Sequence, residues 1–387
     1  MRKGPVMKKA TRFVGLDVHA ETIAVAVAEP GRTGELESLG TIPNRFEAVA
    51  KLVKRLGGPK GLLVCYEAGP TGYVLYWQLI KIGVECEVVA PTLVPQKVGD
   101  RVKTDRRDAL KLARCLRAGE LTKVWVPDPA HEALRDLVRA REAAKKDQLR
   151  ARHRLSKFLL RAGCRPPDGT VAFSATHRDW MRAIAFEHAA RQATMADYLN
   201  EIDHAMDRVR RLEQAIDDAV AKAPPALREV IAGLQALRGV AKLTATTLAV
   251  EIGSFSRFEH PTKLMGYAGI TPSEYSTGKS KRKGSITKAG NSHLRRVLVE
   301  AAWAYRHRPA RSLAMRARTR ALPPAVVEIG WKAQDRLCRR YAALQGRRKP
   351  HSKIVTAIGR ELLAFVWAIA THIERGQTPP FVHKDAA

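Results

Sequence analysis

The chain has 387 residues, and 45% of them are hydrophobic, so it can bury sizeable cores and is not a disordered tail. Its 68 lysines and arginines outnumber 38 aspartates and glutamates, and the resulting formal net charge of +30 favours a polyanionic partner such as nucleic acid. The five cysteines stand far apart and are odd in number, which argues against a disulfide framework and against a zinc site.

Strands and helices are expected to alternate through the N-terminal part of the chain. β-Branched and alternating apolar segments predict strands at 12–19, 22–29, 36–42, 61–67 and 84–91. Helical spacing predicts helices at 46–56 and 71–83, and a last helix that begins near Asp105. This order, β-β-β-α-β-α-β-α, implies a mixed sheet with helices on its faces.

Four acidic residues occupy notable places in these elements. Asp17 lies within the first strand among apolar neighbours, where a carboxylate is costly unless it is paired or bound to a metal. Glu67 ends the fourth strand, at the edge where open α/β sheets place ligands. Asp105 and Asp108 are three residues apart and share a face of the last helix. Taken singly, each also has an ordinary interpretation, such as favourable charge at a helix N-terminus.

The order of the elements resembles the RuvC-like branch of the ribonuclease H fold. In that fold strands one and four are neighbours, so Asp17 and Glu67 should meet beneath the last helix. Four carboxylates around one point repel each other unless cations bind between them, and hard oxygen ligands select Mg²⁺ or Mn²⁺. Two such ions suit phosphoryl transfer. The neighbouring cations are expected to hold the phosphates: Lys103, Arg106 and Arg107.

Two long charged segments follow, at about 131–162 and 195–220. In the second, apolar residues recur at steps of three and four, which is typical of a coiled coil or a helical hairpin. One interpretation is a dimerisation arm, which we favour because both segments are long and heavily charged. The other is a helix packed on its own domain.

The segment 234–253 resembles a helix-hairpin-helix, whose turn glycines offer backbone N–H groups to a phosphate. The usual second turn glycine is Ala241 here, so a plain helical hairpin stays open. The later apolar run that begins at Leu362 is too short for a membrane span and predicts a buried helix. With no secretory signal visible at the N-terminus, the sequence predicts a cytoplasmic protein without a membrane partner.

Between these segments lies a strongly basic stretch, 264–303. Glycines at 278, 284 and 290 recur regularly in it, which predicts a loop that holds phosphate rather than a solvated basic face. Its expected nucleic-acid contacts are Lys279, Lys281, Arg282, Lys283, Lys288, Asn291, Arg295 and Arg296.

Four segments, in this order, resemble the DEDD-type insertion-sequence transposases, also called bridge-RNA-guided recombinases: "GLDVHAETIAVAV", "CYEAGPTGY", "VKTDRRDALKLARC" and "GITPSEYSTGKSKRKGSITKAGNSHLRRVLVEAAW". The resemblance implies a multidomain α/β and α protein with a RuvC-like domain, a coiled-coil arm and a mostly helical transposase domain, at 1–125, 126–225 and 226–387. It implies that Asp17, Glu67, Asp105 and Asp108 are the catalytic metal ligands. It also implies a noncoding guide RNA that pairs with donor and target DNA, and a homo-oligomer, a dimer or tetramer formed through the arm.

The resemblance further implies a serine nucleophile in "EYSTG". Many relatives have serine immediately before the glycine, where this chain has Thr277, and Ser276 lies one residue earlier. We favour Ser276 because a primary hydroxyl is less hindered, with Thr277 as the alternate and Ser280 as a weaker third. The hydroxyls could instead only bond phosphate or backbone.

These observations predict a transposase that cuts and rejoins DNA by Mg²⁺- or Mn²⁺-assisted attack of a serine hydroxyl on phosphodiesters. Two other functions remain open. A RuvC-like junction nuclease would use water and need no hydroxyl at 276 or 277. A non-catalytic architectural protein would keep the basic stretch and tolerate loss of the acids.

Overall fold

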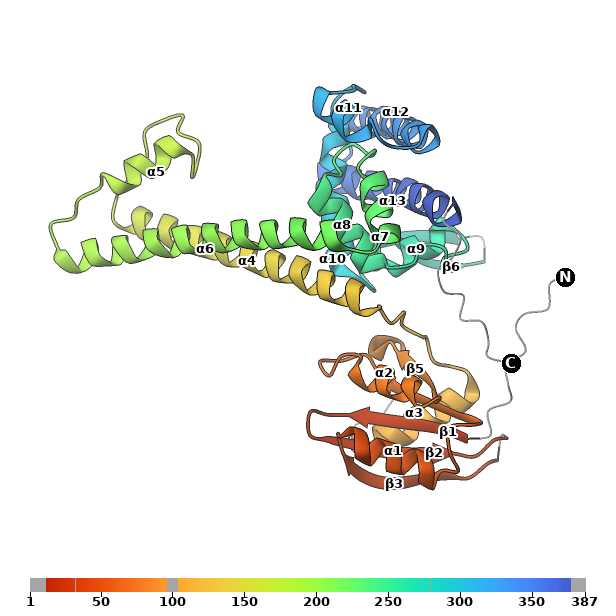
Figure 1. The fold of residues 1–387 in the computed structure, drawn as a ribbon. Helices are drawn as coiled ribbons and strands as arrows, with labels where there is room; N and C mark the ends of the chain where they lie inside the picture. The colour runs from red at the N-terminus through yellow and green to blue at the C-terminus, as the bar shows by residue number, and fades with distance from the viewer. Residues whose placement is uncertain (1–11, 32, 96–103, 279, 377–387) are drawn as a thin grey trace. The chain divides into compact units, whose positions relative to one another are not determined.

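The computed structural model describes residues 12–31, 33–95, 104–278 and 280–376, apart from the side chain of Lys281. It contains two compact units that divide between Val126 and Pro127. The first unit is a mixed α/β layer structure, and the second is helical apart from one β-hairpin (Figure 1). The long helices and the C-terminal helices belong to one unit, so the predicted boundary between 225 and 226 stays a prediction.

A five-stranded mixed sheet forms the first unit, in the order β3-β2-β1-β4-β5. The strands β1 and β2 are antiparallel, as are β2 and β3, whereas β1, β4 and β5 run parallel. All five predicted strands are confirmed, as is the mixed sheet. Their bounds are Arg12–Val18 (β1), Thr22–Ala28 (β2), Leu36–Pro43 (β3), Leu62–Glu67 (β4) and Glu85–Val89 (β5).

Helices cover both faces of this sheet. Helices α1 (Phe46–Arg55) and α2 (Val74–Lys81) pack on one face, where Leu16 and Tyr66 are fully buried. Helix α3 (Asp105–Ala118) packs on the other face. The predicted helices therefore form, and alternate residues of β1 and β4 face opposite layers.

Helix α3 lies unusually close to β1 because the facing residues are small. A Cβ atom on Gly15 would lie 2.4 Å from the carbonyl oxygen of Ala109 and 2.4 Å from the amide nitrogen of Ala113. Alanines of β2 complete this surface. At its other end the helix is fixed by Arg117, which donates hydrogen bonds to the carbonyls of Glu29 and Gly34 at 3.1 and 2.7 Å. Because Gly15 has no side chain, α3 can lie close to β1, and this close packing positions the N-terminal turn of α3.

The second unit begins with a helical hairpin of α4 (Pro129–Arg161) and α6 (Ala189–Lys222), with α5 (Ala175–Arg182) near its far end (Figure 1). The start of α4 packs with the end of α6, and the end of α4 with the start of α6, so the two helices are antiparallel. The buried residues of α6 recur at heptad spacing: Met195, Ile202, Val209 and Ile216. This seam packs against α4 of the same chain, so the periodicity is accounted for without a second copy.

In the described part of the second unit, seven further α-helices, a short 3-10 helix (Trp303–Arg306) and one β-hairpin follow. The helices are α7 (Pro225–Leu234), α8 (Lys242–Ile252), α9 (Pro261–Tyr267), α10 (Ser292–Ala302), α11 (Leu313–Thr319), α12 (Pro324–Gly346) and α13 (His351–Gly376). Helix α13 is long and apolar enough to cross a membrane by length and composition. Its residues Ile358, Leu362 and Val366 are nevertheless fully buried in the core of the unit. The helix is therefore a core element of the unit, as the sequence predicts.

Candidate metal centre and nucleic-acid interface

Asp17 and Glu67 occupy equivalent positions at the carboxyl edge of the sheet. The parallel register pairs Leu16 of β1 with Tyr66 of β4, so each acid is the next residue on its strand. Because successive strand residues alternate between faces, the acids share the face opposite to Leu16 and Tyr66. That is the face covered by α3. The predicted placement of these two acids beneath the last helix therefore follows from the register.

The other two acids lie in the first turn of α3. Thr104 caps this helix, because its hydroxyl oxygen accepts a hydrogen bond from the backbone N–H of Arg107 at 3.3 Å. Asp105 and Asp108 follow directly. Arg106 and Arg107 are exposed beside them. Lys103, the third cation predicted here, lies outside the described residues.

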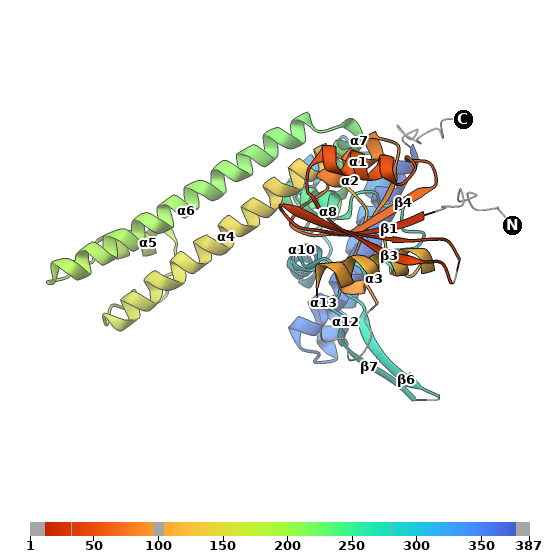
Figure 2. The same cartoon turned by 90° about the horizontal axis from the view of Figure 1, so that it is seen from below.

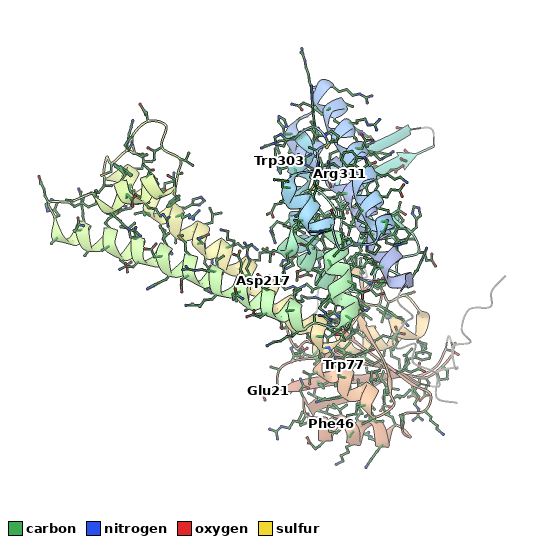
Figure 3. The ribbon with its side chains drawn as sticks, turned by 45° about the horizontal axis from the view of Figure 1, so that its top comes forward. Glu21, Phe46, Trp77, Asp217, Trp303 and Arg311 are labelled. Carbon is green, nitrogen blue, oxygen red and sulfur yellow. The ribbon has the colours of Figure 1, made fainter. Side chains whose placement is uncertain are left out.

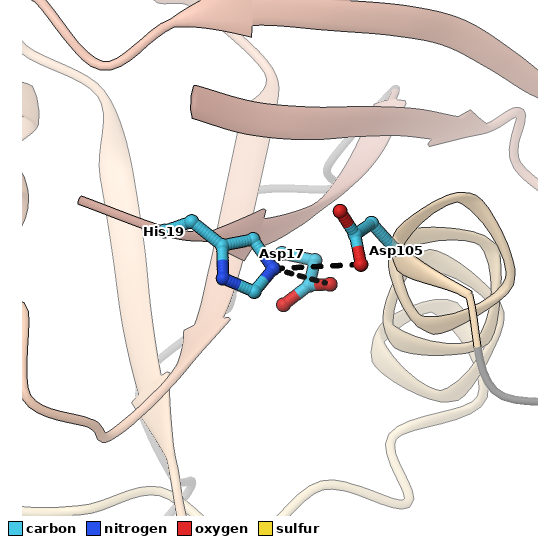
Figure 4. Close-up of side chains that lie close together, drawn as sticks. All are labelled: Asp17, His19 and Asp105. Atoms are coloured by element: carbon cyan, nitrogen blue, oxygen red, sulfur yellow. Dashed lines mark ion pairs between the residues drawn. The ribbon is translucent and has the colours of Figure 1, made fainter. Parts of the chain in front are cut away.

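His19 joins the acids, as Figure 4 shows. Its Nε2 atom lies 3.5 Å from Oδ2 of Asp17 and 3.5 Å from Oδ1 of Asp105. The ligand atoms of these three residues all lie within 4.8 Å of one another. The side chains of Asp17 and Asp105 are 23% and 64% exposed, so the site is open to solvent. His19 is not among the predicted site residues, although its spacing of two from Asp17 was a usable signal.

The electrostatics of Asp17 reflect this crowding. Burial raises its pKa above the usual value, and the carboxylates of Asp108 and Asp105 raise it further, whereas His19 lowers it. A carboxylate that is disfavoured by its acidic neighbours is stabilised by a cation placed among them. Carboxylate oxygens suit a hard divalent ion such as Mg²⁺ or Mn²⁺. The residues present therefore fit such an ion.

In the second unit, the predicted basic loop is instead a β-hairpin of β6 (Pro272–Thr277) and β7 (Ser280–Ile286). It projects from the helices of this unit (Figure 2). Each glycine has its own local cause. Gly278 has a φ of 56° in the turn, a Cβ on Gly284 would lie 2.4 Å from Oγ of Ser273, and a Cβ on Gly290 would lie 2.1 Å from a backbone oxygen. Local geometry is therefore sufficient to explain these glycines, and phosphate binding by this stretch stays a prediction.

The hairpin separates the two candidate nucleophiles. Ser276 and Thr277 are adjacent on β6, so their side chains point to opposite faces. Ser276 Oγ donates a hydrogen bond to Oε1 of Glu274 at 2.7 Å, two residues earlier on the same face. Both residues are exposed. Glu274 was not predicted, because its i, i+2 relation to Ser276 depends on a strand that the sequence did not indicate.

The predicted nucleic-acid contacts divide into two groups. Arg282, Lys283 and Lys288 are exposed, and none has a salt bridge within the described part of the chain. They remain candidates for phosphate contacts. Lys279 and the side chain of Lys281 lie outside the described residues.

The remaining three contacts have partners inside the unit. Asn291 caps α10 through two backbone N–H groups and donates a hydrogen bond to Glu251 at 2.7 Å. Arg295 donates hydrogen bonds to backbone carbonyls, including that of Ala268 at 3.0 Å. Arg296 pairs with Glu142 and with an acid on its own helix. Their structural contacts account for these residues, and their binding to nucleic acid stays a prediction.

The turn between α7 and α8 is the predicted helix-hairpin-helix. Gly239 has a φ of 78° there, and a Cβ on it would lie 2.4 Å from the carbonyl oxygen of Ala301. Packing against α10 is therefore sufficient reason for this glycine. A plain helical hairpin accounts for the geometry, and phosphate binding by this turn stays a prediction.

A buried polar network joins α4 to α8 and α10. Arg139 forms two hydrogen bonds of 2.8 Å with Glu251, whose side chain is 1% exposed. Glu142 contacts Nδ1 of His293 at 2.6 Å and the guanidinium of Arg296 at 3.1 Å. The network therefore ties the helical hairpin to the helix that follows β7.

We expect Glu142→Gln to destabilise the second unit by on the order of 3 kcal/mol at neutral pH. Burial alone would raise the pKa of Glu142, but Lys146, His293 and Arg296 lower it from 4.5 to about 2. A group with a lowered folded-state pKa stabilises fully above its unfolded-state pKa, and the contribution is lost as the pH falls through the folded-state value. The parent should therefore lose more stability than the variant between pH 4.5 and about 2, measured by chemical denaturation.

Glu328→Gln is the matched control, because Glu328 also pairs with a lysine four residues later but is exposed. It should change the unfolding free energy little. Equal acid dependence of the parent and Glu142→Gln would contradict the assignment.

Comparison with known proteins extends these observations. A family model described as "Transposase", for the DEDD transposases of IS110, matches residues 14–163. A second, described as "Transposase IS116/IS110/IS902 family", matches residues 232–316. The first match contains Asp17, Glu67, Asp105 and Asp108, and the second contains Ser276.

Individual relatives match over most of the chain. The putative transposase y4qE of Sinorhizobium fredii is 43% identical over 361 residues, which cover 92% of this chain and 88% of the relative. The transposase for insertion sequence element IS1533 of Leptospira borgpetersenii is 32% identical over 340 residues, or 87% and 97% of the two chains. The pilin gene-inverting protein of Moraxella bovis is 25% identical over 277 residues, or 71% and 68%.

Proposed function

Since this chain belongs to the IS110 family of insertion-sequence transposases, which cut and rejoin DNA, we propose that it does so with a serine nucleophile and a carboxylate-bound metal. One observation carries the proposal most: Asp17, His19 and Asp105 gather at the carboxyl edge of the sheet. Asp108 lies in the same helical turn as Asp105, and the register of β1 and β4 assigns Glu67 to the same face as Asp17. Isolated acids would not need to converge in this way.

In the proposed reaction the Ser276 oxygen attacks a DNA phosphorus. The bond from phosphorus to the serine oxygen forms, the bond from phosphorus to one deoxyribose oxygen breaks, and the DNA remains attached to the protein. Glu274, which accepts the hydrogen bond from the hydroxyl, takes its proton. Arg282 and Lys283 neutralise charge that develops on the phosphate. The reverse attack by a DNA hydroxyl rejoins the strand.

The acid site supplies the second component. Asp17, Glu67, Asp105 and Asp108 would hold Mg²⁺ or Mn²⁺ and would orient it at the carboxyl edge of the sheet. A bound divalent ion polarises phosphoryl oxygens and stabilises the leaving oxygen. Arg106 and Arg107, which are exposed beside these acids, position the phosphates. The two sites must act on the same phosphodiester in the assembled complex.

The proposal includes a noncoding guide RNA and assembly into a dimer or tetramer in the cytoplasm. The formal charge of +30 supports a large nucleic-acid partner. The heptad seam of α6 already packs against α4, so a contact between arms would need the outward residues of α4. Leu149 and Leu160 qualify, because they are 53% and 58% exposed and lie eleven residues apart on one side of the helix.

A metal-dependent nuclease that uses water is the second candidate. The open acid site favours it, because Asp105 is 64% exposed and water can reach it. Such an enzyme would leave no DNA on the protein. The covalent adduct therefore distinguishes the two functions.

A reconstituted cleavage reaction tests the proposal. We expect the purified protein to cut DNA of its element only when Mg²⁺ or Mn²⁺ and the co-purified RNA are both present. EDTA treatment should abolish product because it removes the ion from the carboxylate site. Ribonuclease treatment should abolish product because base pairing with the RNA would select the DNA site. Undiminished cleavage in excess EDTA would contradict the metal site, and undiminished cleavage after ribonuclease would contradict the guide RNA.

A further inference from the structure

An arginine-rich segment precedes α12. Between Glu300 and Glu328 the chain has no acidic residue and six arginines: Arg306, Arg308, Arg311, Arg316, Arg318 and Arg320. The segment extends beyond the part of the chain that the transposase family models match, which ends at residue 316. It comprises a loop and α11, which lies beside α12 (Figure 1). None of the sites described above uses it.

Part of this segment lines a groove of about 460 Å³ between α11 and α12. Arg311, Arg316 and Arg320 supply its charge, and Figure 3 labels Arg311 in the second unit. The guanidinium of Arg311 lies 4.6 Å from the ring centre of Trp331. Met315, Val327 and Trp331 supply large apolar groups to the lining. The groove therefore combines a cationic edge with an apolar and aromatic wall.

In the described part of the chain, the three groove arginines lack a carboxylate partner. None of Arg311, Arg316 and Arg320 forms a salt bridge within the described residues. Three arginines farther along α12 do have carboxylate partners. Arg336 and Arg340 pair with Glu361, and Arg339 pairs with Asp335. Three uncompensated cations in one groove attract an anion, and the planar guanidinium matches the geometry of phosphate.

The groove is preformed. Arg238 donates a hydrogen bond to the carbonyl of Arg308 at 2.8 Å, and the fully buried Gln334 donates one to the carbonyl of Ala310 at 2.8 Å. Ser312 then caps α11 through the backbone N–H of Met315. These contacts fix the loop that carries Arg311, so binding would not have to order it.

We propose that this groove binds an unpaired nucleic-acid strand. Successive phosphates contact Arg311, Arg316 and Arg320, and a base packs against Met315, Val327 and Trp331. Duplex nucleic acid presents phosphates but keeps the faces of its bases in the stack, whereas an unpaired strand offers both. The apolar wall therefore favours the single strand. The proposal concerns binding alone and does not depend on the identity of the nucleophile.

Binding of labelled oligothymidylate, oligouridylate and a duplex of equal length to the full chain tests this inference. We expect Arg311→Ala/Arg316→Ala/Arg320→Ala to weaken single-strand binding by roughly tenfold or more. It should reduce the slope of log K against log salt by about 2, since each contact to a single strand contributes about 0.7. Trp331→Leu should weaken single-strand binding and leave duplex binding unchanged. The two oligonucleotides show whether DNA or RNA is preferred.

The control is Arg336→Ala/Arg339→Ala/Arg340→Ala, which removes the same charge from paired arginines. Its single-strand affinity should stay within about twofold of the parent. Equal losses in the two triple variants would overturn the proposal, as would an equal loss of duplex binding. Thermal unfolding checks that each variant is folded, and Arg316→Ala/Arg320→Ala, which leaves the contact between Arg311 and Trp331 intact, repeats the test with less risk to the fold.

Discussion

Alanine at Asp17, Glu67, Asp105 or Asp108 is expected to abolish strand cleavage and to leave nucleic-acid binding largely intact. A bound divalent ion contributes several kcal/mol to stabilising the transition state, so loss of one ligand should cost on the order of 10³-fold in rate. Binding should survive because removing an acid from a chain with a net charge of +30 does not weaken its attraction for phosphate. The measurements are single-turnover cleavage and a parallel binding titration.

Glu37→Ala provides the matched control, because Glu37 is an exposed acid on β3 of the same sheet. It should cut DNA at the rate of the parent. Since Asp17 is the least exposed of the three clustered ligands and β1 is central to the sheet, thermal unfolding must show that its variant is folded. Full activity in any two of the four alanine variants would contradict the tetrad.

His19→Ala should have a smaller effect than loss of an acid, because His19 Nε2 lies 3.5 Å from carboxylate oxygens of Asp17 and Asp105 and its side chain is half-exposed. The four acids were predicted from the sequence, whereas this histidine was overlooked. The alternation of β1 and the ends of the predicted strands indicate where Asp17 and Glu67 lie. His19 lies within the predicted strand 12–19, two residues after Asp17 and on the same face, so the alternation could also have indicated it.

The β-hairpin of β6 and β7 could not be predicted from the sequence. Strands are predicted from apolar residues on one face, and β6 and β7 are exposed almost throughout, so they carry no such pattern. The stretch therefore resembles a loop in its composition. The partners of Asn291 and Arg296 were equally hidden, because Glu251 and Glu142 lie 40 and 154 residues away in the chain.

The heptad pattern of α6 does not reveal its packing partner. A heptad repeat at Met195, Ile202 and Val209 predicts that this face of α6 packs against another helix, but it does not identify that helix. In this structure the helix that packs against this face is α4 of the same chain. A dimerisation arm can therefore not be inferred from the repeat alone.

A covalent attachment of DNA to Ser276 is the other large effect that we expect. Denaturing the protein during the reaction and digesting it with protease should leave a peptide that spans residues 276 and 277 on a DNA end. Ser276→Ala should remove this adduct and the rejoined product together. Loss of the adduct in Thr277→Ala instead would move the role by one residue.

Because the side chains of Ser276 and Thr277 point to opposite faces of the hairpin, a change at Glu274 can distinguish the two candidate nucleophiles. Ser276 lies on the face of Glu274, whereas Thr277 lies on the face of Tyr275. Glu274→Gln should therefore slow adduct formation by on the order of 10²-fold or more if Ser276 attacks, because the amide cannot take the proton. It should have little effect if Thr277 attacks. Cleavage that proceeds without an adduct in the parent would show that water is the nucleophile, and the acid site alone would then account for the reaction.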